Sequence, residues 1–253
     1  MKQTAGGVTV HQYPGTNANG RLDSELGEKK MRDIDAASES LLPKLCQKAR
    51  ELGASEAVAL PITDVVVDER ARLKCMVPVC ASYGRSPLCP PGVMPISEFK
   101  RILANYHSAV LLKLDVELSQ PPEQVTAQEN LAEAWQVLKP ALERSEETVT
   151  PIGNYLYPLR DSQQRLYEII GAIESLCIAE GFPFAAGLGS GWRSLCDECI
   201  GIGSGLPCRH PFRARPSMEA LGVDVIATAR KARMPLSFAK NESRNRVGLV
   251  LVD

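Results

Sequence analysis

Six of the eight cysteines in this 253-residue chain form two triads, each within a stretch rich in proline and glycine. The first triad has the spacing Cys75-x4-Cys80-x8-Cys89, and Pro90-Pro91 follows it directly. The second has the spacing Cys196-x2-Cys199-x8-Cys208. Proline and glycine interrupt helices and strands, so each triad is predicted to lie in a loop between packed elements. The fold must therefore hold two loops that carry thiols.

The rest of the chain supplies the scaffold, and a chain of this length buries enough surface to stay folded without cross-links. Apolar periodicity predicts helices over residues 38–52, 97–106, 122–144 and 160–180. Short β-branched or apolar runs predict strands over residues 62–67, 109–114, 184–188, 223–227 and 247–252. The alternation predicts an α/β or α+β fold, with a mixed central sheet flanked by helices and both cysteine loops on one side.

The chain is expected to contain one domain. Residues 1–35 are polar and rich in Gly, Asn and Asp, which is typical of a flexible arm, and residues 36–253 are predicted to form a single metal-binding domain. The first 20 residues have no apolar run typical of a secretory signal, and no stretch approaches 18 apolar residues. These features predict a cytoplasmic protein that makes no membrane contact.

Charge excludes one class of function and suggests another. The net charge is −1 and the pI is about 6.4, which excludes a broadly basic nucleic-acid binder. The segment from Gly205 to Arg246 nevertheless has nine Lys or Arg and three Asp or Glu, a net charge of +6. Because aromatic side chains that stack on bases are scarce here, a small anionic ligand is a better match for this charge than a nucleic acid.

The cysteines are of two kinds. Cys46 and Cys177 lie on apolar helix faces, where a free thiol packs as a small hydrophobic side chain. The other six lie in loops, and cytoplasmic thiols stay reduced, so clustered cysteines there indicate metal binding or catalysis. We therefore predict that the metal ligands are Cys75, Cys80, Cys89, Cys196, Cys199 and Cys208.

Spacing favours an iron–sulfur cluster over zinc. A structural zinc site uses four ligands, mostly as two close pairs, and this chain has only the pair Cys196/Cys199. Cysteine beside proline and irregular spacing are typical of cluster ligands. A [4Fe-4S] cluster held by three cysteines keeps one iron open for a substrate, a partner thiolate or another ligand, whereas pooling both triads allows one four-cysteine cluster with two spare thiols.

Two alternatives remain. One zinc ion could take Cys196, Cys199, Cys208 and His210, although a histidine two residues after a cysteine is an awkward ligand. A thiol oxidoreductase could use the Cys196/Cys199 pair, but the two acidic residues between these thiols would raise their pKa and oppose that chemistry.

Three residues after the second triad are candidates to bind a substrate or to support the ligands, namely Arg209, His210 and Arg215. Arg215 could instead form an ion pair with Glu219 around the short helix that Ser217 is predicted to cap and Gly222 to end.

The two signatures resemble those of an uncharacterised bacterial and archaeal family of predicted metal-binding proteins. The first is Cys75-x4-Cys80-x2-Tyr83-Gly84-x4-Cys89-Pro90-Pro91. The second runs from Cys196 to Cys208-Arg209-His210-Pro211 and continues through Ala214-Arg215-Pro216-Ser217-Met218-Glu219-Ala220. The resemblance covers residues 45–252 and implies a metal or iron–sulfur protein of anaerobes. Family members often have a further cysteine just before the second triad, where this chain has Trp192-Arg193-Ser194-Leu195, and this favours a three-cysteine or mixed site.

The sequence thus predicts an iron–sulfur protein with a redox role, or with Lewis-acid chemistry at an open iron. It would act on a small anionic substrate or a redox partner protein, as an oxidoreductase or a lyase if it is an enzyme. A zinc-stabilised binding module and an electron-transfer protein with a saturated cluster are the alternatives. The sequence indicates no particular oligomeric state.

Overall fold

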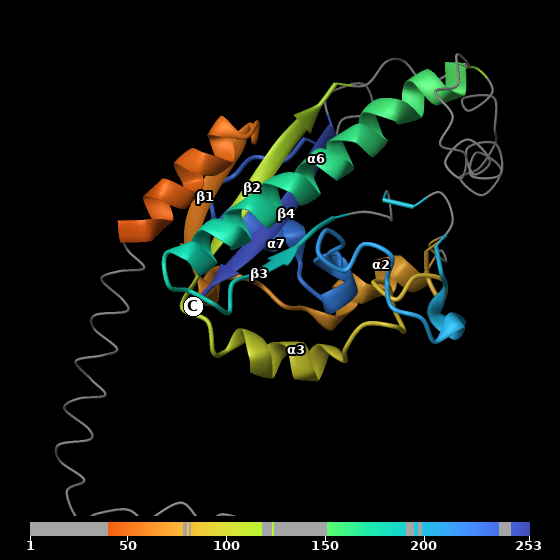
Figure 1. Cartoon of the computed structure of the whole chain (residues 1–253), viewed down its shortest axis with the longest axis horizontal. Helices are drawn as coiled ribbons and strands as arrows, with labels where there is room; N and C mark the ends of the chain where they lie inside the picture. Colours follow the sequence, from red (N-terminus) through yellow and green to blue (C-terminus); the bar gives the residue numbers. More distant parts are fainter. Residues whose placement is uncertain are drawn as a thin grey trace, which may run out of the picture. The chain divides into compact units, whose positions relative to one another are not determined.

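A computed structural model describes residues 40–77, 80, 82–117, 123, 151–190, 195–196, 199–237 and 244–253 (Figure 1). The helices are one over residues 40–51, α2 (Leu73–Met76), α3 (Ile96–Leu103), α6 (Pro151–Ala179) and α7 (Val225–Lys231). The strands are β1 (Glu56–Pro61), β2 (Ser108–Val116), β3 (Ala186–Leu188) and β4 (Arg244–Val252). Short 3-10 helices are η1 (Ile62–Asp64), η2 (Glu69–Arg72), η3 (Ile202–Ser204) and η4 (Glu219–Leu221).

The four strands form one sheet in the order β1-β2-β4-β3, and all three strand pairings are antiparallel. Of the two fold classes predicted, the structure is therefore α+β. The sheet was expected to be mixed, and this detail is wrong for the described strands, because no parallel pairing joins them.

Both faces of the sheet are covered. Side chains of successive strand residues point to opposite faces, so Val110 and Leu112 of β2 pack in one core and Ala109 and Leu111 in another. The first core contains the buried residues of the helix over 40–51 and of α6, which cross the same face of the sheet in Figure 1. The second core contains buried residues of α3, η4 and α7.

The two predicted core cysteines are confirmed. Cys46 lies in the helix over residues 40–51 and Cys177 lies in α6, and both are buried free thiols in the first core. The predicted helix ends are confirmed as well, because Gly53 has φ +106 and Gly181 has φ +95, conformations that glycine adopts without strain.

Two predicted strands are wrong. A strand was predicted over residues 62–67, but the strand in this part of the chain is β1, which ends at Pro61. The residues that follow Pro61 form η1. The segment expected as a strand over 223–227 instead begins α7, because the Asp224 carboxylate caps the helix by accepting from the Ala227 amide at 2.9 Å. Both segments keep only one isolated bridge, between Val67 and Val223.

The remaining predicted elements are confirmed where the structure describes them. Ser217 Oγ accepts from the Ala220 amide at 3.1 Å at the start of η4, and Gly222 follows that helix with φ +83. α6 begins nine residues earlier than predicted. The helix predicted over 122–144, apart from residue 123, and the arm predicted over 1–35 lie outside the described residues.

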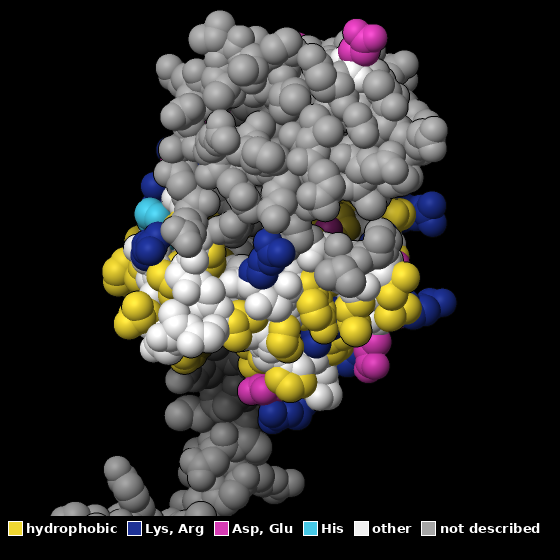
Figure 2. All heavy atoms as spheres, turned by 90° about the vertical axis from the view of Figure 1, so that its right-hand side faces the viewer, with side chains coloured by type: hydrophobic (Ala, Val, Ile, Leu, Met, Phe, Trp, Pro, Cys, Tyr) yellow, Lys and Arg dark blue, Asp and Glu magenta, His cyan; other side chains and the backbone are white. Residues whose placement is uncertain are grey.

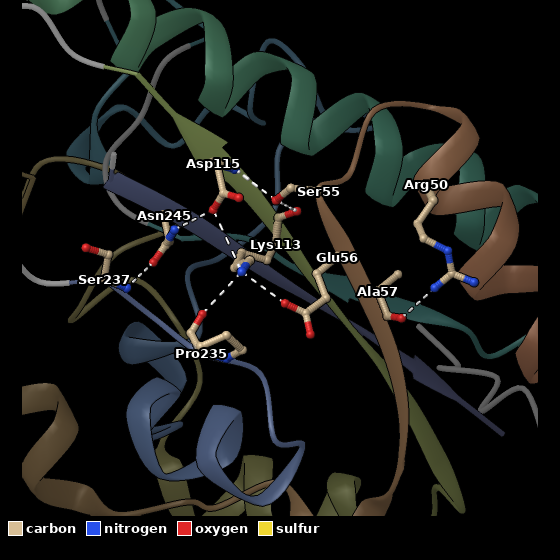
Figure 3. A network of polar contacts seen from close by, with 9 residues as sticks. All are labelled: Arg50, Ser55, Glu56, Ala57, Lys113, Asp115, Pro235, Ser237 and Asn245. Atoms are coloured by element: carbon tan, nitrogen blue, oxygen red, sulfur yellow. Dashed lines mark hydrogen bonds and ion pairs between the residues drawn. The ribbon is translucent and has the colours of Figure 1, made fainter. Parts of the chain in front are cut away.

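A network of hydrogen bonds and ion pairs links three strands of the sheet to the chain after α7 (Figure 3). Lys113 of β2 is buried, and its Nζ lies 2.9 Å from Glu56 Oε2 on the neighbouring strand and 3.2 Å from the Pro235 carbonyl oxygen. Asp115 lies 3.8 Å from the same Nζ and accepts from Asn245 Nδ2 at 2.6 Å. The network thus joins β1, β2 and β4 to the chain after α7.

Within the described part of the chain, no helix has both the length and the apolar character that crossing a membrane requires.

Candidate metal centre

The first cysteine loop is folded back on itself by its own backbone. Cys75 lies in α2 rather than in the predicted loop, and the Cys80 amide donates to the Cys75 carbonyl oxygen at 3.0 Å. Gly84 adopts φ +68, and its amide donates to the Pro90 carbonyl oxygen at 2.9 Å. These hydrogen bonds hold the part of the loop that carries Cys80 against the part that follows Cys89.

The three thiols of the first loop interact electrostatically. Burial is the main reason why the pKa of the Cys89 thiol rises to about 11, and the charges of Cys80 and Cys75 raise it further. Hydrogen bonds with the buried Ser86 and Ser82 side chains oppose this shift. Burial, followed by the charge of Cys80, also raises the pKa of Cys75. The first triad is therefore a group of mutually interacting thiols.

The second triad lines one pocket. The pocket is small and open: the empty space beside its lining residues is about 370 Å³, and this figure includes open solvent at the mouth. Its lining residues are Ser86, Pro87, Leu88, Tyr167, Leu195, Cys196, Cys199, Cys208, His210 and Ala214. All three cysteines of the second triad thus share a single concave site with His210.

His210 shapes the end of the second loop through its backbone. Its amide donates to Cys208 Sγ at 3.4 Å, and its carbonyl oxygen accepts from the Ala214 amide at 2.8 Å. The backbone at His210 therefore fixes the end of the second loop around the Cys208 sulfur.

The two cysteine loops lie side by side. Residues 86–88 of the first loop form part of the wall of the second triad's pocket. A Cβ placed on Gly201 would also lie 3.8 Å from the Arg85 carbonyl oxygen, so the two loops contact each other. The prediction that both loops lie on one side of the sheet is confirmed, and Figure 1 shows them together near α2.

The thiols are gathered but do not form a compact donor group. Among the residues that the structure describes, no three His, Cys, Asp or Glu side chains come together closely enough to hold a metal ion as they stand. None of the six cysteines of the two triads forms a disulfide, and soft thiolate ligands are the donors that zinc and iron–sulfur clusters prefer. The donor set thus matches these metals by chemistry, and the loops bring the donors to one side of the fold.

The three candidate residues after the second triad differ in position. Arg209 is exposed, and His210 lines the pocket. Arg215 does not pair with Glu219. Its guanidinium instead forms a two-point ion pair with Glu174 of α6, with Nε at 2.9 Å from Oε2. Arg215 therefore anchors the chain that follows the second loop to the scaffold.

Sequence reasoning missed several polar residues near the cysteines. Tyr167 of α6 lines the pocket, and burial raises its pKa to about 12. Gln163, one turn earlier, is 1% exposed, and its side chain partly opposes the rise in the Tyr167 pKa. Gln163 could have been found from the sequence, because it is a polar residue on the apolar face of the helix predicted over 160–180. Tyr167 could not, because a tyrosine on that face resembles an ordinary core residue.

Apolar side chains are exposed around both loops. Figure 2 shows this side of the molecule, where hydrophobic side chains lie among lysines and arginines. The exposed apolar residues near the two loops include Leu73, Met76, Val77, Leu206 and Phe212. Exposed apolar groups beside a cofactor site are typical of surfaces that meet another molecule.

Alkylation of the metal-free chain should separate the thiols of the first triad. At pH 8 we expect iodoacetamide to modify the exposed Cys80 first and Cys89 much more slowly. A pKa of about 11 in place of the ordinary 9.0 lowers the thiolate fraction of Cys89 about 100-fold. Peptide mass spectrometry over time would measure both rates, and raising the pH to 10 should accelerate Cys89. Equal rates at pH 8 in the folded chain, with the denatured chain as reference, would contradict the described burial of Cys89.

The fold and the pocket define a class of protein, an α+β domain whose two cysteine-bearing segments adjoin on one side of the sheet. The chain belongs to the family described as predicted metal-binding protein (DUF2284), whose family model matches residues 58–252. The match includes both triads, so the predicted resemblance to a family of metal-binding proteins is confirmed at that level. Comparisons with curated proteins and with solved structures gave no match.

Proposed function

We propose that this chain is a cytoplasmic iron–sulfur protein whose cluster, a [4Fe-4S] group, is held by thiols of the two cysteine loops. The observation that carries the proposal is the gathering of six cysteines, none of them in a disulfide, in two adjoining segments, with Cys196, Cys199 and Cys208 on one pocket. Membership of a predicted metal-binding family supports the metal, and the irregular spacing of the cysteines favours a cluster.

The proposed role is redox chemistry, or Lewis-acid chemistry on a small anionic substrate. A bound cluster would supply an electron or an open iron. The chain would supply the hydrogen bond from the His210 amide to Cys208, the pocket wall at Tyr167, and the positive charge of the exposed Arg209 that follows Cys208. The exposed apolar side chains around the loops support a contact with a redox partner protein.

A second function is favoured by one observation. Because His210 lines the same pocket as the second triad, this loop offers three sulfur donors and one nitrogen donor, a set that structural zinc sites use. In this case zinc would stabilise the loops as a binding surface, and the chain would have no redox role.

The proposal is tested by purification without oxygen, followed by a visible spectrum and assays of iron, acid-labile sulfide and zinc. We expect a brown protein that contains iron and sulfide. The variants Cys75→Ser and Cys199→Ser should lose most of the iron, because a serine hydroxyl replaces a thiolate ligand. Cys46→Ala is the matched control, since that cysteine lies in the core, and it should keep the iron of the parent.

The outcomes separate the alternatives. A colourless, iron-free protein with stoichiometric zinc would overturn the iron–sulfur proposal and favour the zinc module. If iron is present, addition of cyanide or a small thiol should change the EPR spectrum through the open iron. An unchanged spectrum would favour a saturated electron-transfer cluster. Disulfide exchange that Cys196→Ser abolishes while metal content stays constant would instead identify a thiol oxidoreductase.

A further inference from the structure

Large apolar side chains are exposed on the two segments that carry the cysteine triads, residues 73–95 and 195–214. The part of the chain that the structure describes has eleven exposed large hydrophobic residues, and seven of them lie on these two cysteine segments. The seven are Leu73, Met76, Val77, Met94, Ile202, Leu206 and Phe212. A single exposed apolar residue is ordinary, whereas a group of them beside one pocket indicates a surface that meets another molecule.

Phe212 is held at the surface by a tight turn. The His210 carbonyl oxygen accepts from the Arg213 amide at 3.1 Å and from the Ala214 amide at 2.8 Å. This turn presents the Phe212 ring to solvent, where it is 89% exposed. Because the backbone is already fixed, a partner that covers the ring loses little conformational entropy in doing so. Aromatic residues are enriched in protein interfaces, so Phe212 is well placed to anchor one.

The exposed apolar residues of the two segments lie on one side of the fold. A Cβ on Gly201 would lie 3.8 Å from the Arg85 carbonyl oxygen, and residues 86–88 share one pocket with the second triad. Arg72 Nη2 donates to the Met94 carbonyl oxygen at 3.0 Å, which holds the end of the first segment beside the start of α2. Figure 2 shows hydrophobic side chains together on this side of the molecule. The apolar groups therefore border the pocket that the second triad lines.

The charge of this surface is positive. The described residues of the two segments include no Asp or Glu, and they include four exposed cations, Lys74, Arg85, Arg209 and Arg213. Arg213 shares its charge with Glu168 at 3.1 Å. With Asp197 and Glu198, which lie outside the described residues, the two segments have four cations and two acids, a net charge of +2. Since the whole chain has a net charge of −1, the rest of it has −3, and this asymmetry orients an acidic partner toward the two segments.

We propose that these seven apolar and four basic residues form a docking surface for a small acidic electron-carrier protein. This inference rests on the proposed redox function and names the kind of partner that the site receives. Carboxylates around the carrier's redox group would meet the cations, and an apolar contact at the centre would cover Phe212 and its neighbours. One electron then passes from the reduced carrier to the proposed cluster, and the carrier leaves in its oxidised form.

An anionic membrane would attract the same charges, but the local structure favours a protein. Surfaces that lie on membranes mostly use a long amphipathic helix with one apolar face. Here the exposed apolar residues lie on α2, which has four residues, and on the irregular chain of the two segments. A compact patch of this kind matches the small contacts that electron carriers make.

The test measures the affinity of the anaerobically purified chain for two acidic carriers, a [2Fe–2S] ferredoxin and a flavodoxin, by titration calorimetry. A basic c-type cytochrome is the carrier of opposite charge. We expect both acidic carriers to bind at low salt and the cytochrome not to bind. Raising the salt concentration from about 20 mM to about 300 mM should weaken the binding at least about tenfold, because salt screens exposed charges.

Two variants test the two halves of the surface. Arg85→Glu and Phe212→Ala should each weaken the binding of ferredoxin about tenfold at low salt, and only Arg85→Glu should also reduce the dependence on salt. Arg101→Glu is the matched control for charge, since Arg101 is exposed in the last turn of α3. Phe184→Ala is the matched control for the ring, since Phe184 is 69% exposed and precedes β3, whereas the second cysteine segment follows β3. Both controls should keep the affinity of the parent.

The iron assay and the binding assay fail separately. If the chain contains iron but neither acidic carrier binds better than the cytochrome, or if the two variants bind like their controls, the docking surface is wrong and the proposed function stands. If the chain lacks iron and still binds the carriers through Arg85 and Phe212, the proposed redox function fails and the surface assignment stands for an acidic protein. Binding to vesicles that contain anionic lipid, with no binding to either carrier, would overturn the docking proposal in favour of a membrane contact.

Discussion

Arg215→Met is expected to lower the free energy of unfolding by about 3 to 5 kcal/mol. Arg215 and Glu174 form an ion pair whose side chains are only 17% and 12% exposed. Glu174 also accepts from the Gly187 amide at 2.7 Å, so this carboxylate joins α6, β3 and the chain after the second cysteine loop. Without the guanidinium, a buried carboxylate would lose its charge partner. Chemical denaturation of the metal-free chain would measure the change.

A neighbouring ion pair provides the matched control. Arg213 lies 3.1 Å from Glu168, but these side chains are 50% and 62% exposed, so Arg213→Met should cost less than about 1 kcal/mol. The double variant Arg215→Met/Glu174→Met should recover much of the lost stability, since it removes both buried charges. If Arg215→Met lowers the stability by no more than the Arg213 variant, the Glu174 pair is not the buried anchor described here.

Gly187→Ala is expected to destabilise the fold by about 3 kcal/mol, because no space exists for the added methyl group. A Cβ on this residue of β3 would lie 2.1 Å from Ile170 Cγ2 and 3.1 Å from Glu174 Oε1. Ile170 is fully buried in α6, so relief would require the helix to move off the sheet. The melting temperature and the denaturation midpoint should both fall.

Gly171→Ala in α6 is the control with the opposite expected sign. A Cβ on Gly171 meets no atom within 4 Å, and alanine favours helix formation over glycine. The substitution should raise the stability by about 0.5 to 1 kcal/mol. Equal effects of the two substitutions would contradict the close approach of α6 to β3.

The ion pair with Glu174 changes the role expected of Arg215. The basic segment after Cys208 suggested a group for an anionic substrate, but the structure uses this guanidinium to hold the loop to α6. Positive charge near the pocket then depends on residues such as the exposed Arg209. The ion pair thus positions the second cysteine loop, and its loss should affect metal binding only through the loop.

Much of the fold could be predicted from local sequence patterns. The helices that contain Cys46 and Cys177 followed from apolar spacing at three and four residues, and their ends followed from Gly53 and Gly181. The choice between α/β and α+β could not be made. Because β2 is buried on both faces, its sequence is a continuous apolar run and does not show the alternation expected of a strand with one exposed face.

The sequence by itself determined the helices of the first core, the two cysteine triads and the metal-binding family, since each depends on residues close together in the chain. Only the tertiary structure decided that Glu174, 41 residues away, is the partner of Arg215 and that the two cysteine loops adjoin. It also joined η4 to the segment just before the first triad through the hydrogen bonds of Arg72 to Ala220, 148 residues apart. Packing between distant segments selects such partners, and spacing along the chain does not encode that selection.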